Sequence, residues 1–591
     1  MLSLAARIEG ALGKAPADLV LEGGRIVNVF TTEVLEGSVA VRGDRIVAVG
    51  DIPEGARGPA TEIRDLAGRF LVPGYIDAHM HVGGSYLPIA ALAAALLERG
   101  TTSLATDMYE LYAMFGIAGV EESVQLAEQA GLKILFMSPA HLLGLERMGT
   151  FAHTPDVAEF LEMGRWERTV AVNEPPPFVV LRGNESVLDV IEAALRERKV
   201  FEGHAVGISG ADLQAYVAAG ASSDHEALAL DDAQEKLRLG YRIMMREGSA
   251  SRDLANLAPL LLEFPASSRF VMVCTDEVEP KDLVAEGHVD HKLRKLVELG
   301  VDPVVAVQTA TINIAEYFGL ADQIGSISPG KIADLLVVDE LEAFRPSLVV
   351  ANGRVVAEAG RYLGPLDELQ RTSDSLRSKV VLARPPSPDD FALAGPLESG
   401  RAEVRVIGIA DGTLVSEART HECEIRGGVI LSDPPSDVLR VAVLERHVGS
   451  GRAGRGFISG LRLAAGAVAM TYCHVHQNLL VIGTSDAEMA HAAHVVAGLG
   501  GGMAVVRAGE VVKSVELPVG GVLGSRGLEE MDHEMRQMEK AICSIGCELT
   551  SPVLSIAFSV LPTITAYGLT DLGLYDVLAE QFVDVVVRVE P

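Results

Sequence analysis

The sequence predicts an α/β protein: a TIM-type (β/α)8 barrel, a composite β-sandwich made from two separate segments, and an additional C-terminal α/β domain. Three observations lead to this prediction. Strand and helix patterns alternate over residues 73–324, a span of roughly 250 residues that suits such a barrel. Antiparallel β patterns flank this stretch on both sides. A linker rich in Pro and acidic residues, 385–390, then precedes a last segment that mixes strands with helices.

The first segment, residues 1–72, reads as short strands joined by turns. Apolar residues recur with a period of two at 18–28, 34–41 and 44–50, and glycines separate these runs, as in antiparallel sheets. The same pattern returns at 325–365, after the alternating stretch. We therefore expect residues 1–72 and 325–365 to form one composite β-sandwich.

The barrel segment, residues 73–324, contains eight candidate strands, each followed by a helical pattern. These strands begin near residues 75, 102, 133, 169, 200, 221, 242 and 270. In a barrel of parallel strands, functional side chains lie at the C-terminal ends of the strands. A site is therefore expected at these ends.

Residues 391–591 are predicted to form a separate C-terminal domain. Strand patterns such as 466–473 alternate there with helical patterns such as 486–498. This domain either covers the mouth of the barrel or builds a dimer interface, and the sequence leaves both possibilities open.

Composition argues against several classes of protein. The chain has 591 residues and a formal net charge of −31, whereas a nucleic-acid groove needs clustered Lys and Arg. The longest apolar run, 87–97, is far shorter than the ~20 residues that cross a bilayer, and the N-terminus shows no export signal. Five scattered cysteines do not suggest a disulfide framework. We expect a cytoplasmic protein without nucleic-acid or membrane partners.

The stretch from Phe70 to Val82 holds the first candidate site residues. Apolar residues lead into Asp77, and His79 and His81 then alternate with apolar neighbours. Because side chains of a strand repeat every two residues, His79 and His81 lie on one face. Two imidazoles side by side at the end of a buried strand form half of a metal site, although a pair of structural histidines gives the same pattern.

The other predicted strand ends carry side chains of the same kinds. In chain order the set is His79, His81, Asp107, Glu174, His204, His225 and Asp276. Taken singly, His204 could be a loop residue, and His225 and Asp276 could cap helices. Their common placement on one rim indicates a metal-dependent active site.

These motifs resemble the amidohydrolase superfamily and, more closely, its adenine deaminase family. LVPGYIDAHMH at 71–81 and GSISPGKIADLLVVD at 325–339 are similar to the first and last motifs of the superfamily. Blocks similar to those of adenine deaminases follow in the same order: GHAVGISG at 203–210, SSDHE at 222–226, MREGSASR at 245–252, CTDE at 274–277 and EGHVDH at 286–291. ERH at 445–447 and GRGFISG at 454–460 extend the resemblance into the last domain.

The resemblance implies two divalent transition metal ions, Mn or Fe, with Zn as the alternative; nitrogen and oxygen donors suit all three. The implied ligands are His79, His81 and Asp276 for one ion and His204 and His225 for the other. Many amidohydrolases bridge two ions with a carbamylated lysine at the C-terminal end of strand four. Lys133 is expected at the start of a strand and Lys199 at the end of a helix, so neither lies at the C-terminal end of a strand. Glu174 does, and we expect its carboxylate to be the bridge.

The reaction implied by the resemblance is hydrolytic deamination of adenine to hypoxanthine and ammonia, which makes a small purine base the expected partner. Activated water would attack C6, and Asp276 would accept the water proton and return it to N1 or to the departing ammonia. Asp107 is a second candidate catalytic acid, although it could equally cap a strand end. Substrate-binding residues are not assigned. We expect a homo-oligomer, with a dimer as the simplest form.

Three stretches depart from the adenine deaminase pattern: TDMYE at 106–110, NEPPPF at 173–178 and CHVHQN at 473–478. They leave open a different aminopurine or a cyclic amide as the substrate. A cyclic-amide hydrolase of the dihydroorotase or allantoinase kind would need the bridging lysine. A non-catalytic scaffold of the same fold is a further alternative; such proteins typically lose metal ligands, which this chain retains.

Overall fold

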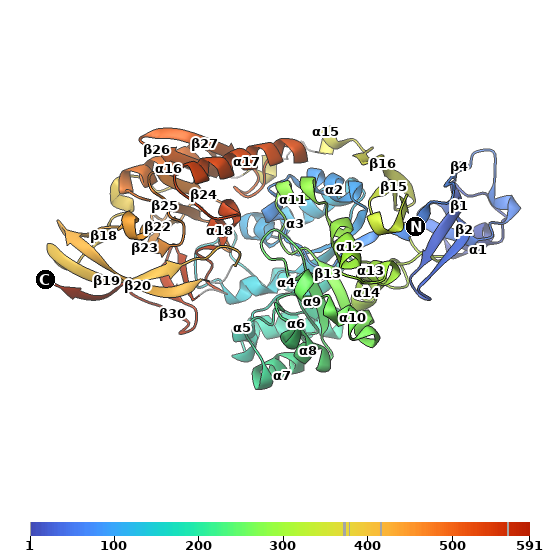
Figure 1. The fold of residues 1–591 in the computed structure, drawn as a ribbon, viewed down its shortest axis with the longest axis horizontal. Coiled ribbons are helices and arrows are strands. Elements are labelled where there is room, and N and C mark those ends of the chain that lie inside the picture. The colour runs from blue at the N-terminus through green and yellow to red at the C-terminus, as the bar shows by residue number, and fades with distance from the viewer. Residues whose placement is uncertain (1, 370–373, 378, 414–415, 564–565) are drawn as a thin grey trace.

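The computed structural model describes residues 2–369, 374–377, 379–413, 416–563 and 566–591. Figure 1 shows an elongated molecule: the N-terminal strands lie at one end, the barrel in the middle and the C-terminal segment at the other end. The C-terminus lies at the left end of the long axis, and the N-terminus lies in the right half of the view, inward of β1 and β4 (Figure 1).

Within the described residues, eight short strands form a parallel barrel. They are β6 (Tyr75–Asp77), β7 (Thr101–Thr106), β8 (Lys133–Ser138), β9 (Thr169–Asn173), β10 (Val200–Glu202), β11 (Ser223–Asp224), β12 (Arg242–Arg246) and β13 (Val271–Cys274). Strands β6 to β10 form one sheet in order, and β11 to β13 form a second. Parallel bridges from Phe201 to Ala221 and from Met80 to Asp276 join the two sheets at both edges. The barrel is therefore closed, and the predicted fold class is confirmed.

Helices cover the outside of the barrel (Figure 1). They are α2 (Ile89–Glu98), α3 (Tyr109–Gln129), α4 (Val157–Gly164), α5 (Pro177–Leu181), α6 (Glu185–Arg196), α7 (Gly210–Ala218), α8 (Leu230–Arg238), α9 (Leu254–Leu257), α10 (Pro259–Leu262), α11 (Pro280–Ala285), α12 (Val289–Glu298), α13 (Pro303–Thr309) and α14 (Ile312–Tyr317). Helix α6 illustrates why they form. The Asn184 side chain accepts from the Val187 amide and caps its start, and its buried residues recur at the helical spacing of one apolar face.

The apolar run at 87–97 becomes most of helix α2, which is almost entirely buried. It packs against β7 and α3 of the barrel and against β16 (Arg354–Glu358) and β17 (Arg361–Tyr362). A helix enclosed on all sides is apolar around its whole circumference, which explains its composition. Among the described residues, no helix combines the length and the apolarity that crossing a membrane requires.

The segments before and after the barrel meet in one nine-stranded sheet. Besides β16 and β17, its strands are β1 (Leu19–Asn28), β2 (Glu33–Arg42), β3 (Arg45–Gly50), β4 (Glu62–Asp65), β5 (Phe70–Pro73), β14 (Leu335–Val338) and β15 (Pro346–Ala351), and helix α1 (Leu4–Ala11) packs on β3. Strand β14 pairs antiparallel with β5. Gly74 then leads directly into barrel strand β6. No side chain fits at this position, because a Cβ on Gly74 would lie 2.3 Å from Thr102 Oγ1. The sheet thus anchors the strand that carries the HxH motif, while the predicted domain boundaries stay predictions.

The C-terminal segment is built on an eleven-stranded sheet. Its strands are β18 (Leu393–Ala394), β19 (Ser399–Gly408), β20 (Glu417–Arg426), β21 (Val429–Ile430), β22 (Leu439–Leu444), β23 (Ala453–Ser459), β24 (Ala467–Met470), β25 (Leu479–Gly483), β26 (Gly502–Arg507), β27 (Glu510–Glu516) and β31 (Val586–Glu590). Its other elements are α16 (Asp486–Leu499), α17 (Leu528–Ser544), α18 (Pro552–Phe558) and a small sheet of β28 (Tyr567–Thr570), β29 (Gly573–Asp576) and β30 (Gln581–Phe582). Helix α15 (Leu366–Leu369) precedes this segment and contacts α2. Helices α16 and α17 pack on the sheet, and α17 also contacts α11 of the barrel.

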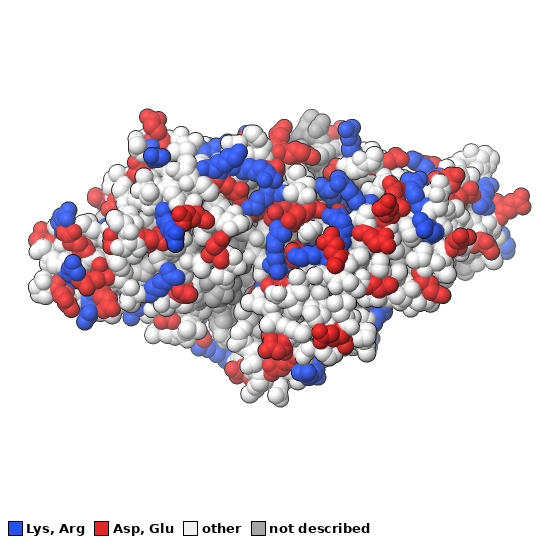
Figure 2. Space-filling model, viewed as in Figure 1, with Lys and Arg blue, Asp and Glu red and all other residues white. Residues whose placement is uncertain are grey.

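Charged side chains of both signs intermix on the face drawn in Figure 2. Two ion pairs near the junction of the barrel and the C-terminal segment illustrate this. Arg252 Nη1 lies 2.9 Å from Glu286 Oε1, and Lys281 Nζ lies 2.5 Å from Glu539 Oε1. These lysine and arginine side chains are therefore paired with carboxylates of the same chain.

Candidate active site

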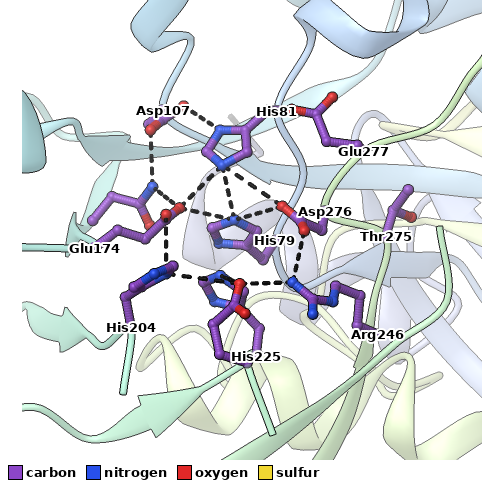
Figure 3. Close-up of polar contacts among 12 residues, drawn as sticks. His79, His81, Asp107, Glu174, His204, His225, Arg246, Thr275, Asp276 and Glu277 are labelled. Atoms are coloured by element: carbon purple, nitrogen blue, oxygen red, sulfur yellow. Dashed lines mark hydrogen bonds and ion pairs between the residues drawn. The ribbon is translucent and has the colours of Figure 1, made fainter. Parts of the chain in front are cut away.

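The barrel brings the predicted ligands together at the C-terminal ends of its strands, with Glu174 among the histidines (Figure 3). Glu174 Oε1 lies 2.9 Å from His79 Nε2 and 3.1 Å from His81 Nε2. The two Nε2 atoms are 3.3 Å apart. Glu174 Oε2 lies 3.6 Å from His204 Nδ1. One carboxylate therefore faces histidines from the segments that follow β6 and β10.

His225 and Asp276 join the same cluster. Asp276 Oδ1 lies 3.8 Å from the Nε2 atoms of both His79 and His81. Three groups each have ligand atoms within 4.8 Å of one another: His79–His225–Asp276, His79–His81–Glu174 and Glu174–His204–His225. Two of these groups share Glu174, as expected for a carboxylate between two ions.

The donor set fits divalent transition metal ions. Its atoms are imidazole nitrogens and carboxylate oxygens, and the buried His204 Nδ1 has no hydrogen-bond partner. Burial lowers the pKa of His79, but Glu174 and Glu202 outweigh this effect and raise the pKa well above its usual value. Burial raises the pKa of Glu174, but His81 and His79 outweigh this effect and hold the pKa well below its usual value. The site thus attracts positive charge, which bound cations would supply in place of protons.

Backbone conformation turns the two carboxylates toward the site. Glu174 follows β9 with φ +50°, and Asp276 follows β13 with φ +64°. Such left-handed conformations cost non-glycine residues roughly 1–3 kcal/mol and cluster at functional sites. Both residues with this strained backbone are predicted metal ligands, so the strain lies at the candidate active site.

Glu202 supports two of the histidines from the side away from Glu174. Its Oε1 lies 3.1 Å from His225 Nδ1, and its Oε2 lies 3.6 Å from His79 Nδ1. The rings of His79 and His225 stack with centroids 4.1 Å apart. A carboxylate at Nδ1 favours the tautomer whose Nε2 is free to bind metal.

We expect Glu202→Gln to weaken metal binding by about 10–100-fold, because the histidines lose the anionic partner that fixes their tautomer. Chelator competition on the folded protein measures this affinity. Glu279→Gln is the matched control, since Glu279 is equally buried and pairs with Lys281. Wild-type affinity in Glu202→Gln would disprove the orienting role.

Asp107 lies behind His81 and is fully buried. Its Oδ1 is 3.1 Å from His81 Nδ1, and the same oxygen accepts from the Tyr109 amide at the start of α3. Asn173 Nδ2 donates to Asp107 Oδ2 and to Glu174 Oε1, both at 2.9 Å. Asp107 therefore both accepts from the first amide of α3 and contacts a predicted ligand, while its predicted catalytic role stays a prediction.

Asp276 is held by a buried arginine. Arg246 Nη1 donates to Asp276 Oδ2 at 3.0 Å and to Glu226 Oε1 at 2.6 Å, and Arg246 Nε donates to Asp253 Oδ2 at 3.2 Å. Sequence reasoning missed the role of Arg246, although the MREGSASR block contains it. The arginine leaves Asp276 Oδ1 directed at the histidine cluster (Figure 3).

Asp77 ties the first barrel strand to the last. Its Oδ1 accepts from the backbone amides of His79 at 3.2 Å and Thr275 at 3.1 Å. Its Oδ2 faces the Thr275 hydroxyl and lies 2.9 Å from His288 Nε2. Asp77 thus fixes the separation between the strand that carries the histidines and the strand that leads to Asp276.

The ligands open into a cavity of about 220 Å³. The barrel contributes His81, Tyr109, His141, Leu145, Glu174, Pro176, Pro177, Phe178, His204, Val206, Ile208, His225, Glu226, Asp276 and Glu277, and the C-terminal segment contributes His474, Val475, Phe558, Leu561 and Thr563. The C-terminal segment therefore covers the barrel mouth, which the sequence left undecided. Residues of all three stretches that depart from the family pattern line this cavity.

The closed barrel and the donors at its strand ends define the class of protein. The chain matches the amidohydrolase family over residues 70–356, which places it among these hydrolytic enzymes. It also matches the adenine deaminase C-terminal domain over residues 413–581. With relatives at 34–37% identity over nearly the whole chain, the protein belongs to the adenine deaminase family.

Curated relatives match from end to end. The adenine deaminase of Moorella thermoacetica is 37% identical over 581 residues, which cover 98% of this chain and 97% of the relative. That of Desulfatibacillum aliphaticivorans is 37% identical and covers 98% of both chains. A solved adenosine deaminase from Xanthomonas campestris with bound Zn is similar over 60% of this chain and 96% of its own, with 19% identity and a TM-score of 0.45.

Proposed function

We propose that this chain hydrolyses adenine to hypoxanthine and ammonia with two divalent metal ions as cofactors. One observation carries the proposal: the six side chains expected as ligands, Glu174 among them, lie in one cluster beside a cavity. Relatives named adenine deaminase, which match over nearly the whole chain, support adenine as the substrate.

The structure offers enough donors for both ions. One ion would be held by His79, His81 and Asp276, and the other by His204 and His225. Glu174 would bind both ions. Divalent cations bound there supply a water molecule that is acidic enough to act as a nucleophile near neutral pH. The choice among Mn, Fe and Zn stays open, because the donor set suits each of them.

The chain's own residues would then move the protons. Asp276 is anchored on Arg246 through Oδ2 at 3.0 Å, which leaves Oδ1 to accept a proton from the attacking water. A bond forms between the water oxygen and C6 of adenine, and the bond from C6 to the exocyclic nitrogen breaks. Asp276 returns its proton to N1 or to the exocyclic nitrogen, and the second proton of the water goes to the other of these two nitrogens. The exocyclic nitrogen then leaves as ammonia, and hypoxanthine remains. Asp107 takes part by orienting His81.

We expect the purified protein to carry about two equivalents of transition metal and to release ammonia from adenine. Chelation should abolish ammonia release, and added Mn should restore it. Metal analysis and an ammonia assay measure both. A metal-free protein without turnover would support the scaffold alternative, and ring opening of a cyclic amide without ammonia release would support the hydrolase alternative.

A different aminopurine is the second candidate substrate. The observation that favours it is the lining of the cavity, where Tyr109, Phe178 and Val475 come from stretches that depart from the family pattern. Rates of ammonia release from a panel of aminopurines distinguish the two candidates. A kcat/KM highest for adenine supports the first, and one highest for another member supports the second.

The remaining expectations concern the whole protein. A purine base stays the proposed partner, a homodimer the proposed assembly, and the cytoplasm the proposed location. Sedimentation of the purified chain tests the assembly directly.

A further inference from the structure

Two aromatic side chains of the C-terminal segment border the cavity that holds the metal ligands. His474 lies between β24 and β25, and Phe558 ends α18. Their rings are nearly parallel, with centroids 3.9 Å apart and planes 27° apart. Both side chains are buried, yet both line the cavity. They form one aromatic cluster at the cavity wall, which we call the stacked pair.

The stacked pair lies close to the metal ligands. The Tyr109 ring centroid is 5.1 Å from that of His81 and 5.7 Å from that of His474. One ring therefore separates His474 from a predicted ligand. A substrate whose reacting carbon lies beside that ligand must occupy the cavity next to this surface.

His474 is fixed by two phenols and has no nitrogen left for a substrate. Its Nδ1 contacts the Tyr109 hydroxyl, and its Nε2 lies 2.9 Å from the Tyr472 hydroxyl. A neutral imidazole has one donor and one acceptor, so a single tautomer serves both phenols. Burial holds the pKa of His474 well below its usual value, which keeps the ring neutral. His474 therefore presents ring surface to the cavity.

The same hydrogen bonds reach a carboxyl group on the cavity wall. The Tyr472 hydroxyl lies 3.4 Å from both carboxyl oxygens of Glu277, which also lines the cavity. Removing the His474 ring would free Tyr109 and Tyr472 together. The orientation of the polar groups beside the substrate thus depends on a residue of the C-terminal segment.

Part of the cavity wall is apolar. Pro176, Pro177, Phe178, Val206 and Ile208 of the barrel line it. An aromatic surface combined with apolar side chains suits a flat heterocycle, because such a ring gains most from dispersion and from leaving water. A few fixed polar groups, such as those of Tyr109 and Glu277, then set its orientation.

We propose that His474 and Phe558 form the surface against which the base of the substrate packs, and that they determine specificity for planar heterocycles. The inference rests on the proposed function, since it takes a purine as the substrate. It also assigns the C-terminal segment a part in substrate binding. The proposed metal ligands all come from the barrel, so both parts of the chain contribute to one site.

The test compares KM, kcat and hypoxanthine binding in variants of the full metal-loaded chain. Phe558→Leu should raise KM for adenine about tenfold and leave kcat within about twofold, since a packing surface is lost equally from ground state and transition state. Phe558→Tyr, which keeps the ring, should stay within about threefold of wild type in KM. His474→Phe keeps a ring but loses both phenol contacts, and it should raise KM about tenfold and lower kcat as well. Equilibrium dialysis with hypoxanthine should show the same increases in Kd.

His476→Gln is the matched control. His476 is a buried histidine of the same loop and packs on Phe151, and it is absent from the described residues that line the cavity. It should leave KM and Kd near wild-type values. Metal content and thermal melting verify that each variant is loaded and folded.

The outcomes separate this inference from the proposed function. Unchanged KM and Kd in Phe558→Leu, in a chain that deaminates adenine, would overturn the inference alone. A wild-type chain that binds hypoxanthine but releases no ammonia would overturn the proposed function, and Kd would still test the stacked pair. A wild-type chain that binds neither adenine nor hypoxanthine would overturn both.

Discussion

Replacing Asp276 by Asn should lower kcat for adenine by about 10³-fold or more, because the variant cannot accept the water proton and binds metal less well. The amide has nearly the same shape as the carboxylate and can still face Arg246, so the barrel should remain folded. Steady-state ammonia release measures the loss. Circular dichroism and metal analysis, run on the same sample, separate lost chemistry from lost structure.

Asp253→Asn is the matched control for this experiment. Asp253 binds the same arginine, with Oδ2 at 3.2 Å from Arg246 Nε, but it does not belong to the ligand cluster. We expect it to keep activity within about tenfold of wild type. Near-normal turnover in Asp276→Asn would refute the proton-transfer role, and an equal loss in Asp253→Asn would indicate that Arg246 is the critical group.

Replacing Glu174 by Ala should reduce the metal content to about one equivalent or less and lower kcat/KM by about 10³-fold, which corresponds to about 4 kcal/mol. Glu174 faces both His79 at 2.9 Å and His204 at 3.6 Å, so its loss removes a shared anionic donor. Two cations held by the histidines would then repel each other without the negative charge between them. Metal analysis after gel filtration measures the stoichiometry.

Glu174→Asp provides the comparison for this variant. It keeps the charge but shortens the side chain by one methylene, and it should retain more metal and more activity than Glu174→Ala. If Glu174→Ala binds two ions as tightly as wild type, the bridging assignment is wrong. In that case another carboxylate, such as Glu226 on the same rim, would have to supply the charge.

The barrel was accessible from sequence because its strands are short, apolar and regularly spaced. Strand β8 begins at Lys133 and β9 at Thr169, as the pattern predicted. The candidate side chains could be named because each follows such a strand, and the ends of parallel strands share one rim. The resemblance to adenine deaminases then implied which six of them are metal ligands. The order of the strands in the sequence therefore predicted the order of these side chains around the barrel.

The supporting residues could not be recognised in the same way. Glu202 and Asp77 are buried acids within strands. The sequence alone does not show which partners these carboxylates have. Arg246 pairs with Asp276, which lies thirty positions away. Partners that are distant along the chain become visible only when the fold fixes the distances between their atoms.

The sequence by itself determined the alternation of strands and helices, the donor atoms at the strand ends and the family of this protein. Tertiary structure alone decided that the C-terminal segment closes the barrel mouth and brings His474 and Phe558 to the cavity. The physical reason is the range of the interactions. Strand periodicity and hydrophobic spacing act between near neighbours and are written in the order of residues. The docking of two sheets and a barrel depends on the shapes of surfaces that exist only after each part has folded.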